Sequence, residues 1–192
     1  MVNSIDKPKS FSICDEDLSE ESFNLFKSTN KLAIDTEAMG LIHGRDRLCL
    51  VQICDTEDNV CCIRIKPKQT QAKKLQSLLE DQEIEKIFHF ARFDVAALAS
   101  NLGIEVKFIF CTKIASKIGR TYSPRHGLKE VIMELVGVEL DKQAQSSDWG
   151  KVDELSETQL AYAANDVRYL IQARQKLYSM LKREGRWELT KK

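Results

Sequence analysis

The sequence predicts an α/β fold built on one mixed sheet of about five strands. Three short runs of β-type residues come first, segments with helical and strand patterns then alternate, and the remainder of the chain has a helical pattern. With 192 residues, of which 43% are hydrophobic and 30% charged, the chain has enough apolar content to form one large domain around a single core. The same composition excludes a disordered or collagen-like chain.

The first part of the chain predicts one helix followed by three strands. The acidic stretch 15–28 has the pattern of an amphipathic helix with carboxylates in its first turns. Strands are expected at 31–35, 47–54 and 59–65. A turn-like DTED sequence separates the last two strands, which predicts an antiparallel meander.

Helices and strands alternate in the next part. The spacing of apolar residues predicts a helix over 70–82 and another over 92–103, the second ended by Gly103. Strands are expected at 85–90 and 106–112. Such alternation is typical of strands joined by crossover helices, which makes them parallel.

The last part of the chain has a helical pattern. Helices are expected at 112–119 and 127–137, and a long helix begins at Ser156, whose pairing with Gln159 forms a capping box. No repeat or flexible linker interrupts the sequence, so we expect residues 1–192 to form one domain without a C-terminal accessory domain.

Charge and cysteine content limit the classes of function. Lys and Arg number 29, as do Asp and Glu, so any site for a polyanion must be local. The first ten residues have no signal-peptide pattern and no apolar run approaches the roughly 20 residues of a membrane span, so a cytoplasmic protein without a membrane partner is expected. The six cysteines lie mostly in β-like runs, and their spacing matches no zinc template.

Two acidic residues follow the apolar start of the strand predicted at 31–35. Asp35 and Glu37 are two positions apart, so both point to one face of a strand, about 7 Å apart. Burying two like charges together costs free energy unless a cation compensates them. Taken alone, the pair fits a solvent-exposed strand end equally well.

Three further polar residues come from two later segments. Asp94 lies near the start of the helix over 92–103, where the helix dipole by itself favours a carboxylate. Tyr162 and Asp166 are four positions apart, so phenol and carboxylate share one helix face, and neighbouring alanines leave room around them. Each feature by itself also fits ordinary capping or close helix packing.

Four carboxylates from separate segments suit a pair of divalent cations. Mg²⁺ and Mn²⁺ take oxygen ligands and keep positions open for water and phosphate. Two such ions roughly 3.5–4 Å apart would assist hydrolysis of a phosphodiester, and they would also offset the clustered negative charge. The residues therefore point to metal-assisted phosphodiester chemistry.

Three motifs in this order resemble the DEDDy group of 3′–5′ exonucleases, most closely its short ribonuclease D-like members. The likeness covers residues 31–176. The motifs are AIDTEAMGL with RDRLCLVQI, then KIFHFARFDVAAL, then DKQAQSSDWGKVDELSETQLAYAANDVRYL. The resemblance implies a ribonuclease H-like mixed five-stranded sheet, with three antiparallel strands followed by two that are parallel to the first.

The same resemblance implies roles for five residues. Asp35 would bridge two divalent cations, Mg²⁺ or Mn²⁺, while Glu37 and Asp166 would hold the one that activates water. Asp94 would serve the second ion, in part through water. Tyr162 would orient the attacking water, since a phenol with a pKa of about 10 is a poor base at neutral pH.

Substrate contacts are also implied by the resemblance. The terminal nucleotide would meet residues after the first acid pair and residues of the second motif, namely Thr36, Met39, Leu41, His89 and Phe93. His89 fits a strand-end histidine as well, and Met39 and Phe93 fit core packing as well. The segment from Arg120 to Lys129, with Arg125 and His126, suggests a phosphate-binding patch or simply a solvated loop. Trp149 would either stack on a base from a loop over the active site or anchor that loop to the core, and the anchor is favoured.

The expected function is a 3′–5′ exoribonuclease that releases nucleoside 5′-monophosphates from single-stranded 3′ ends. RNA is favoured over DNA only by the ribonuclease D likeness, so a DNA exonuclease of the Werner-helicase type remains an alternative. A catalytically inactive binding scaffold would be expected to lack at least one of the four acids, and all four are present. A nucleotide-binding α/β domain is disfavoured because no glycine-rich phosphate loop follows a strand.

Overall fold

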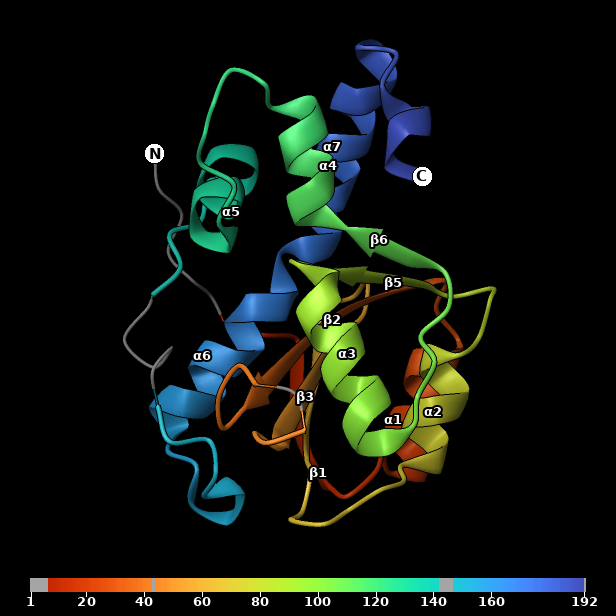
Figure 1. The fold of residues 1–192 in the computed structure, drawn as a ribbon, viewed down its shortest axis with the longest axis vertical. Helices are drawn as coiled ribbons and strands as arrows, with labels where there is room; N and C mark the ends of the chain where they lie inside the picture. The colour runs from red at the N-terminus through yellow and green to blue at the C-terminus, as the bar shows by residue number, and fades with distance from the viewer. Residues whose placement is uncertain (1–6, 43, 142–146, 192) are drawn as a thin grey trace.

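The computed structural model describes residues 7–42, 44–141 and 147–191, and a six-stranded mixed sheet forms its centre (Figure 1). The spatial order of the strands is β1-β4-β3-β2-β5-β6. In chain order they are β1 (Ser10–Asp15), β2 (Lys31–Ala38), β3 (Leu48–Cys54), β4 (Asn59–Arg64), β5 (Glu85–Phe88) and β6 (Ile109–Cys111).

Strand directions agree with the prediction. β2, β3 and β4 form the expected antiparallel meander, and β5 and β6 are parallel to β2 and to each other. Every residue of β3 is buried, because this central strand has strands on both sides and helices over both faces. The ribonuclease H-like mixed sheet is therefore confirmed, with one strand more than expected.

The additional strand is β1, which lies at the sheet edge and pairs in parallel with β4. The prediction missed this strand because its first four residues are exposed and it has no continuous apolar run. The acidic helix predicted over 15–28 is correspondingly shorter: α1 spans Glu20–Lys27 and begins at Ser19, whose side chain accepts a hydrogen bond from the Ser22 amide.

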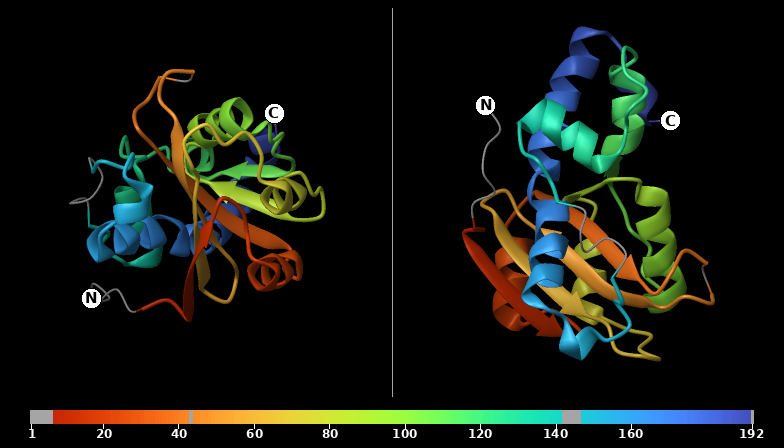
Figure 2. Two further views of the ribbon diagram at one scale, coloured as in Figure 1. Left: turned by 90° about the horizontal axis from the view of Figure 1, so that it is seen from below. Right: turned by 90° about the vertical axis from the view of Figure 1, so that its left-hand side faces the viewer.

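Three helices cover one face of the sheet. They are α1, α2 (Lys73–Leu79) and α3 (Ala91–Leu102), and Figure 2 shows them as a separate layer beside the strands. Leu32 and Ile34 of β2 enter this core together with Leu75 of α2 and Leu98 of α3. Alternate residues of β2 therefore belong to this core, and the residues between them point to the other face.

The other face is covered by α6 (Glu157–Arg168) and α7 (Leu170–Arg183). One long helix from Ser156 was predicted, and this is wrong, because the helix is interrupted at Tyr169. Tyr169 is buried in one hydrophobic cluster with Val131 of α5 (Leu128–Val136). The start is as predicted, since Ser156 and Gln159 form the expected capping box. The interruption lets α6 lie across β2 and β3 while α7 continues past β5 (Figure 1).

The remaining helices gather around α7 at one end of the molecule (Figure 2). They are α4 (Thr112–Gly119), α5 (Leu128–Val136) and the short 3₁₀ segment Trp187–Lys191, while a second 3₁₀ segment, Val152–Glu154, precedes α6. Arg174 of α7 forms an ion pair with the buried Glu85 and lies over the rings of Phe110, Tyr178 and Trp187. This contact joins the helical end to the sheet.

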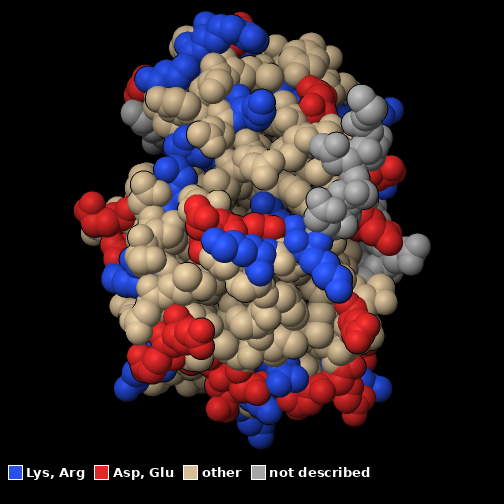
Figure 3. Space-filling view, turned by 180° about the vertical axis from the view of Figure 1, so that it is seen from behind, with Lys and Arg blue, Asp and Glu red and all other residues tan. Residues whose placement is uncertain are grey.

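The surface agrees with the zero net charge. On the face shown in Figure 3, positive and negative side chains are interspersed among uncharged ones, so the described residues there form no continuous basic surface. Within the described residues, none of the helices has the length and apolar character needed to cross a bilayer.

Candidate active site

The first two acids lie near the carboxyl end of β2, a central strand. Ala33 packs with Val167 of α6. Every second residue of a strand points to the same face, so Asp35 and Glu37 face this helix as well. The pairing of β2 with β3 becomes irregular between Glu37 and Ala38, where the strand leaves the regular ladder. The pair is thus held by the sheet, and both residues remain partly exposed.

Helix α6 brings the third acid over this strand. Ala163 and Ala164 are buried against the sheet, and their small side chains allow the helix to approach closely. Asp166 is only 9% exposed and Tyr162 packs on the core beside it. One oxygen atom each from Asp35, Glu37 and Asp166 lies within 4.8 Å of the others. The described chain therefore contains the carboxylate cluster that the sequence suggested.

Asp94 of α3 is not one of the three acids whose oxygen atoms lie within 4.8 Å of one another. Its carboxylate accepts a hydrogen bond of 2.7 Å from the hydroxyl of Thr36, which points to the α3 face of the strand. It is 3% exposed. Asp94 nevertheless acts electrostatically on Asp35 and Glu37, whose pKa values it raises. The structure thus brings three acids close together and holds the fourth, Asp94, in a hydrogen bond with Thr36.

Burial raises the pKa of all four acids, and repulsion between carboxylates adds to it at Asp35 and Glu37. Burial raises the pKa of Asp35 well above its usual range, and repulsion from Asp94, Asp166 and Glu37 adds to this effect. Burial raises the pKa of Glu37 to about 9, with Asp166 and Asp94 contributing repulsion. Burial also raises the pKa of Asp94 to about 7 and the pKa of Asp166 to about 7. A hydrogen bond with Thr36 partly lowers the pKa of Asp94, and one with Tyr162 partly lowers that of Asp166.

This donor set suits a hard divalent cation. The four acids form no ion pair with any Lys or Arg of the described residues. Clustered buried carboxylates without a basic partner are stabilised by a cation, and oxygen donors favour Mg²⁺ or Mn²⁺ over softer metals. No cysteine belongs to a group of potential ligands among the described residues, and all six thiols are free.

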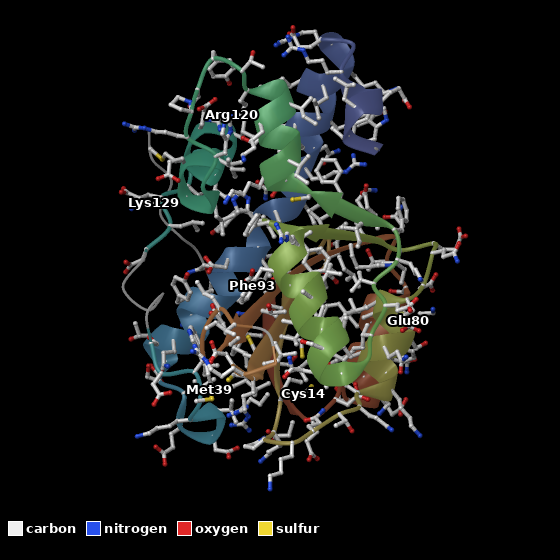
Figure 4. All side chains as sticks on the ribbon, in the orientation of Figure 1. Cys14, Met39, Glu80, Phe93, Arg120 and Lys129 are labelled. Atoms are coloured by element: carbon white, nitrogen blue, oxygen red, sulfur yellow. The ribbon has the colours of Figure 1, made fainter. Side chains whose placement is uncertain are left out.

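A cavity of about 670 Å³ opens over the acids. It lies where β2, β5 and β6 end, the edge at which parallel strands in open α/β sheets commonly bind ligands. Figure 4 shows Met39, Phe93 and Lys129 around this region, from the loop after β2, from α3 and from α5. The predicted residues that line the cavity are Asp35, Thr36, Glu37, Met39, Leu41, His89, Phe93, Tyr162 and Asp166.

His89 enters the cavity as a neutral imidazole. Its Nδ1 atom is 2.9 Å from the hydroxyl of Thr112, and its Nε2 atom is buried without a hydrogen-bond partner among the described residues. Burial, followed by the positive charge of Lys113, lowers the pKa of His89 to about 4. At neutral pH this residue therefore contributes hydrogen bonding and no charge.

Two predicted substrate contacts do not line the cavity. Arg125 is exposed and its carbonyl accepts a hydrogen bond from Arg120, while His126 Nδ1 lies 2.9 Å from the hydroxyl of Ser116. The inclusion of Arg120 in a phosphate-binding patch is also wrong. This side chain is 1% exposed and forms an ion pair with Glu134, so its charge is already compensated inside the protein.

Trp149 has the predicted anchoring position. It is 3% exposed, and its ring centroid lies 6.2 Å from that of Tyr162. Through this contact the loop before α6 packs on the helix that carries Asp166. Burial of the indole stabilises the position of Tyr162 at the cavity wall.

Phe90 and Lys113 are among the cavity residues that sequence reasoning missed. Phe90 is 47% exposed and has a positive φ of 71° just before α3, and the ammonium of Lys113 lies 4.2 Å from its ring centroid. Both follow directly after the carboxyl end of a parallel strand, β5 or β6. That position in the sequence was the available signal.

Comparison with known families agrees with this arrangement. The sequence profile of a family described as 3′–5′ exonuclease matches residues 11–182, which include all four acids and Tyr162. The chain belongs to this 3′–5′ exonuclease family. The recognition made from the three motifs is therefore confirmed.

The chain is similar both to ribonucleases and to a DNA polymerase. The chain is 34% identical over 155 residues to ribonuclease D of Gluconacetobacter diazotrophicus, covering 81% of this chain and 39% of that protein. It is 37% identical over 150 residues to DNA polymerase I of Aquifex aeolicus, covering 78% of this chain and 24% of the polymerase. The chain therefore spans about two fifths of the length of that ribonuclease D.

A solved structure resembles this fold closely. NrnC of Brucella melitensis superposes with a TM-score of 0.89 at 45% identity, covering 94% of this chain and 86% of NrnC. Structures of the same Brucella protein have been determined with bound Mg²⁺ and with bound pGG. The fold and the arrangement of the strands are thus those of an exonuclease of this family.

Proposed function

We propose that the protein is a metal-dependent exonuclease that shortens single-stranded nucleic acid from its 3′ end and releases nucleoside 5′-monophosphates, with RNA preferred. The observation that carries the proposal is the group of oxygen atoms from Asp35, Glu37 and Asp166, which lie within 4.8 Å of one another beneath an open cavity. Membership of the exonuclease family supports the reaction, and the ribonuclease D relative supports RNA.

The carboxylates would hold two divalent cations. Asp35 would help to hold both ions, because Asp94, Asp166 and Glu37 all lie near enough to repel its carboxylate. Asp94 would act in part through water, since Thr36 already occupies one of its oxygens. When bound, such ions supply Lewis-acid activation of water and compensate the charge of the phosphate. The Mg²⁺-bound structure of Brucella NrnC supports magnesium as the first ion to test.

Tyr162 would orient the attacking water without removing its proton. Burial and the nearby charge of Asp166 raise the pKa of Tyr162 well above its usual range, so the phenol keeps its proton at neutral pH. The phenol donates its one proton to Asp166, so it would accept a hydrogen bond from the attacking water. Its packing on Trp149 holds the ring at the cavity wall, which fixes the direction of that hydrogen bond.

The cavity suits the end of a single strand. Met39 and Leu41 are 59% and 79% exposed, and together with Phe93 they offer apolar surface for a base. Lys113 and Lys129 add positive charge for phosphates. The pGG-bound structure of Brucella NrnC supports a short nucleotide chain as ligand.

The test is a time course on matched 5′-labelled single-stranded RNA and DNA, with Mg²⁺, with Mn²⁺ and with chelator. We expect a ladder that shortens from the 3′ end, faster on RNA, and that requires metal. Asp35→Asn should abolish it, whereas Glu83→Gln, which changes an exposed carboxylate away from the cavity, should leave it unchanged. Incubation with pGG provides a defined short substrate for the same comparison.

The DNA polymerase relative makes DNA the second candidate substrate. Faster shortening of the DNA strand would select this alternative and reject the RNA preference. If folded protein shortens neither strand under either metal, the exonuclease proposal is wrong and a binding scaffold replaces it.

A further inference from the structure

Gln52 is a fully buried polar side chain for which the proposed reaction has no role. It lies in the middle of β3 with 0% exposure. Neither its Oε1 nor its Nε2 atom has a hydrogen-bond partner in the part of the chain that the structure describes. An amide buried in this way destabilises a protein, so its presence in the sheet requires a physical explanation.

The register of the sheet places Gln52 next to the acid cluster. Gln52 pairs with Asp35 across β2 and β3, and with Cys62 across β3 and β4. Directly paired residues of antiparallel strands point to the same face, with Cβ atoms about 4.5–5.5 Å apart. Gln52 therefore lies between Asp35 and Cys62, on the face that α6 covers.

The neighbours on this face confirm the direction. Leu50, two positions before Gln52, belongs with Cys62 to the cluster that contains Ala163 of α6. Cys54, two positions after it, packs with Ala33 and Val167. The Gln52 side chain is thus enclosed by the sheet and α6, and Asp35 is the charged residue paired with it across the strands.

We propose that Gln52 is a positioning residue whose side-chain amide holds the carboxylate of Asp35 in its metal-binding orientation. In the cation-bound protein the Nε2 group would donate a hydrogen bond to one oxygen of Asp35, a bond that is not formed among the described residues of this structure. The other lone pairs of the carboxylate would then be directed at the cation. This inference rests on the proposed metal site and extends it to a residue outside the ligand set.

A neutral amide suits this position better than a charged partner. A Lys or Arg next to Asp35 would compensate its charge and compete with the cation, whereas an amide orients the carboxylate and leaves the charge available. On the other side, the sulfur of Cys62 is only a weak acceptor and therefore competes little for the amide hydrogens. Partners of this kind orient metal ligands in many proteins, and their loss typically reduces metal affinity about 10–100-fold.

The test compares Mn²⁺ binding by the folded protein and by Gln52→Met, using calorimetry together with thermal unfolding in chelator. Methionine keeps the length of the side chain and removes both polar atoms. We expect Mn²⁺ affinity to fall by roughly 10-fold or more. The Tm in chelator should stay the same or rise, because an amide without a partner has been removed from the core.

A matched control is Ile53→Val on the same strand. Ile53 points to the opposite face, into the core with Ile34 and Leu98, so this change should lower Tm equally with and without Mn²⁺ and leave Mn²⁺ affinity unchanged. Raising the Mn²⁺ concentration should restore the nuclease rate of Gln52→Met. Gln52→Leu serves the same comparison if the methionine variant does not fold.

Three results would contradict these claims in different ways. If Gln52→Met binds Mn²⁺ as tightly as the unmodified protein, Gln52 does not position Asp35. A lower Tm in chelator with unchanged Mn²⁺ affinity would show that Gln52 is only a structural residue. Absence of Mn²⁺ binding by the unmodified protein would instead overturn the metal site on which the inference rests.

Discussion

Asp35 has the most unfavourable electrostatic position in the molecule's acid cluster. It lies in a central strand, its pKa is raised well above the usual range by burial, and three other carboxylates add repulsion. No Lys or Arg of the described residues forms an ion pair with it. The arrangement that prepares the site for cations therefore destabilises the metal-free protein.

One consequence is that Asp35→Asn should stabilise the metal-free protein while it abolishes exonuclease activity. Asparagine keeps the shape of the side chain and removes one of the repelling charges. A gain of about 1 kcal/mol would raise Tm by roughly 2–4 °C in a chain of this size. Thermal unfolding in chelator measures the effect, with Glu83→Gln as the control for an exposed carboxylate. A lower Tm for Asp35→Asn would show that the carboxylates do not repel one another in the folded state.

The same acids predict an unusual dependence of stability on pH. The pKa of Glu37 rises from its ordinary 4.5 to about 9, and that of Asp166 from 3.8 to about 7. Between these values the folded state binds more protons than the unfolded state, so stability decreases as pH rises.

We therefore expect Tm in chelator to fall from about pH 4, where these groups ionise in the unfolded chain, to about pH 9, where Glu37 ionises in the folded protein. Saturating Mg²⁺ should reduce the fall, because the cation stabilises the ionised carboxylates. Calorimetric scans at several pH values measure both curves. A Tm in chelator that stays constant or increases across this interval would be inconsistent with raised pKa values.

At the scale of the element, α6 is the helix on which the site depends. It carries Tyr162 and Asp166 on one face, and its alanines bring that face close to β2 and β3. Its start is defined by a capping box in which Gln159 N–H donates to the Ser156 hydroxyl over 3.2 Å. The first turn is thus stabilised locally, and the acid lies more than two turns later.

Ser156→Ala should therefore lower stability without changing the chemistry. Loss of this cap is expected to cost about 1 kcal/mol, which lowers Tm by roughly 2–4 °C. The rate at saturating substrate and metal, measured well below Tm, should be unchanged. Ser156→Asp retains a capping oxygen and should keep Tm near that of the unmodified protein. A large loss of rate in Ser156→Ala would mean that the first turn also positions Asp166.

At the scale of the whole molecule, the cavity is assembled from distant parts of one chain. β2, α3, α5 and α6 each contribute side chains, and the described basic residues that line the cavity are Lys113 and Lys129. The surface elsewhere carries both signs of charge, as Figure 3 shows for one face. Electrostatic attraction for a nucleic acid is therefore local and involves few phosphates.

Binding of a single strand should accordingly depend only weakly on salt. With two phosphates contacted, and about 0.7 counterions released for each, the slope of log K against log salt is about −1.4. Titrations with Asp35→Asn protein measure it without cleavage, and Lys113→Met should make the slope less negative by about 0.7. A slope steeper than about −4 would mean that a larger basic surface takes part.

Much of this molecule follows from local sequence patterns. Three features were predictable: the three-stranded meander, the two later parallel strands and the capping box of α6. The spacing of apolar residues and the residues that start or end a helix can be read within a short stretch of sequence. The residue types and order of Asp35, Glu37, Asp94, Tyr162 and Asp166 were likewise sufficient to recognise the family.

Tertiary contacts decided the rest. β1 is a strand because its backbone forms hydrogen bonds with β4. The helix breaks at Tyr169 where that residue packs against α5. The spacing of apolar residues in the sequence does not indicate either contact. Sequence alone also could not show that Arg120 is compensated by Glu134, or that Gln52 lies opposite Asp35. Charge and hydrogen bonding depend on which groups the fold brings within a few ångströms, and that is set by packing across the whole chain.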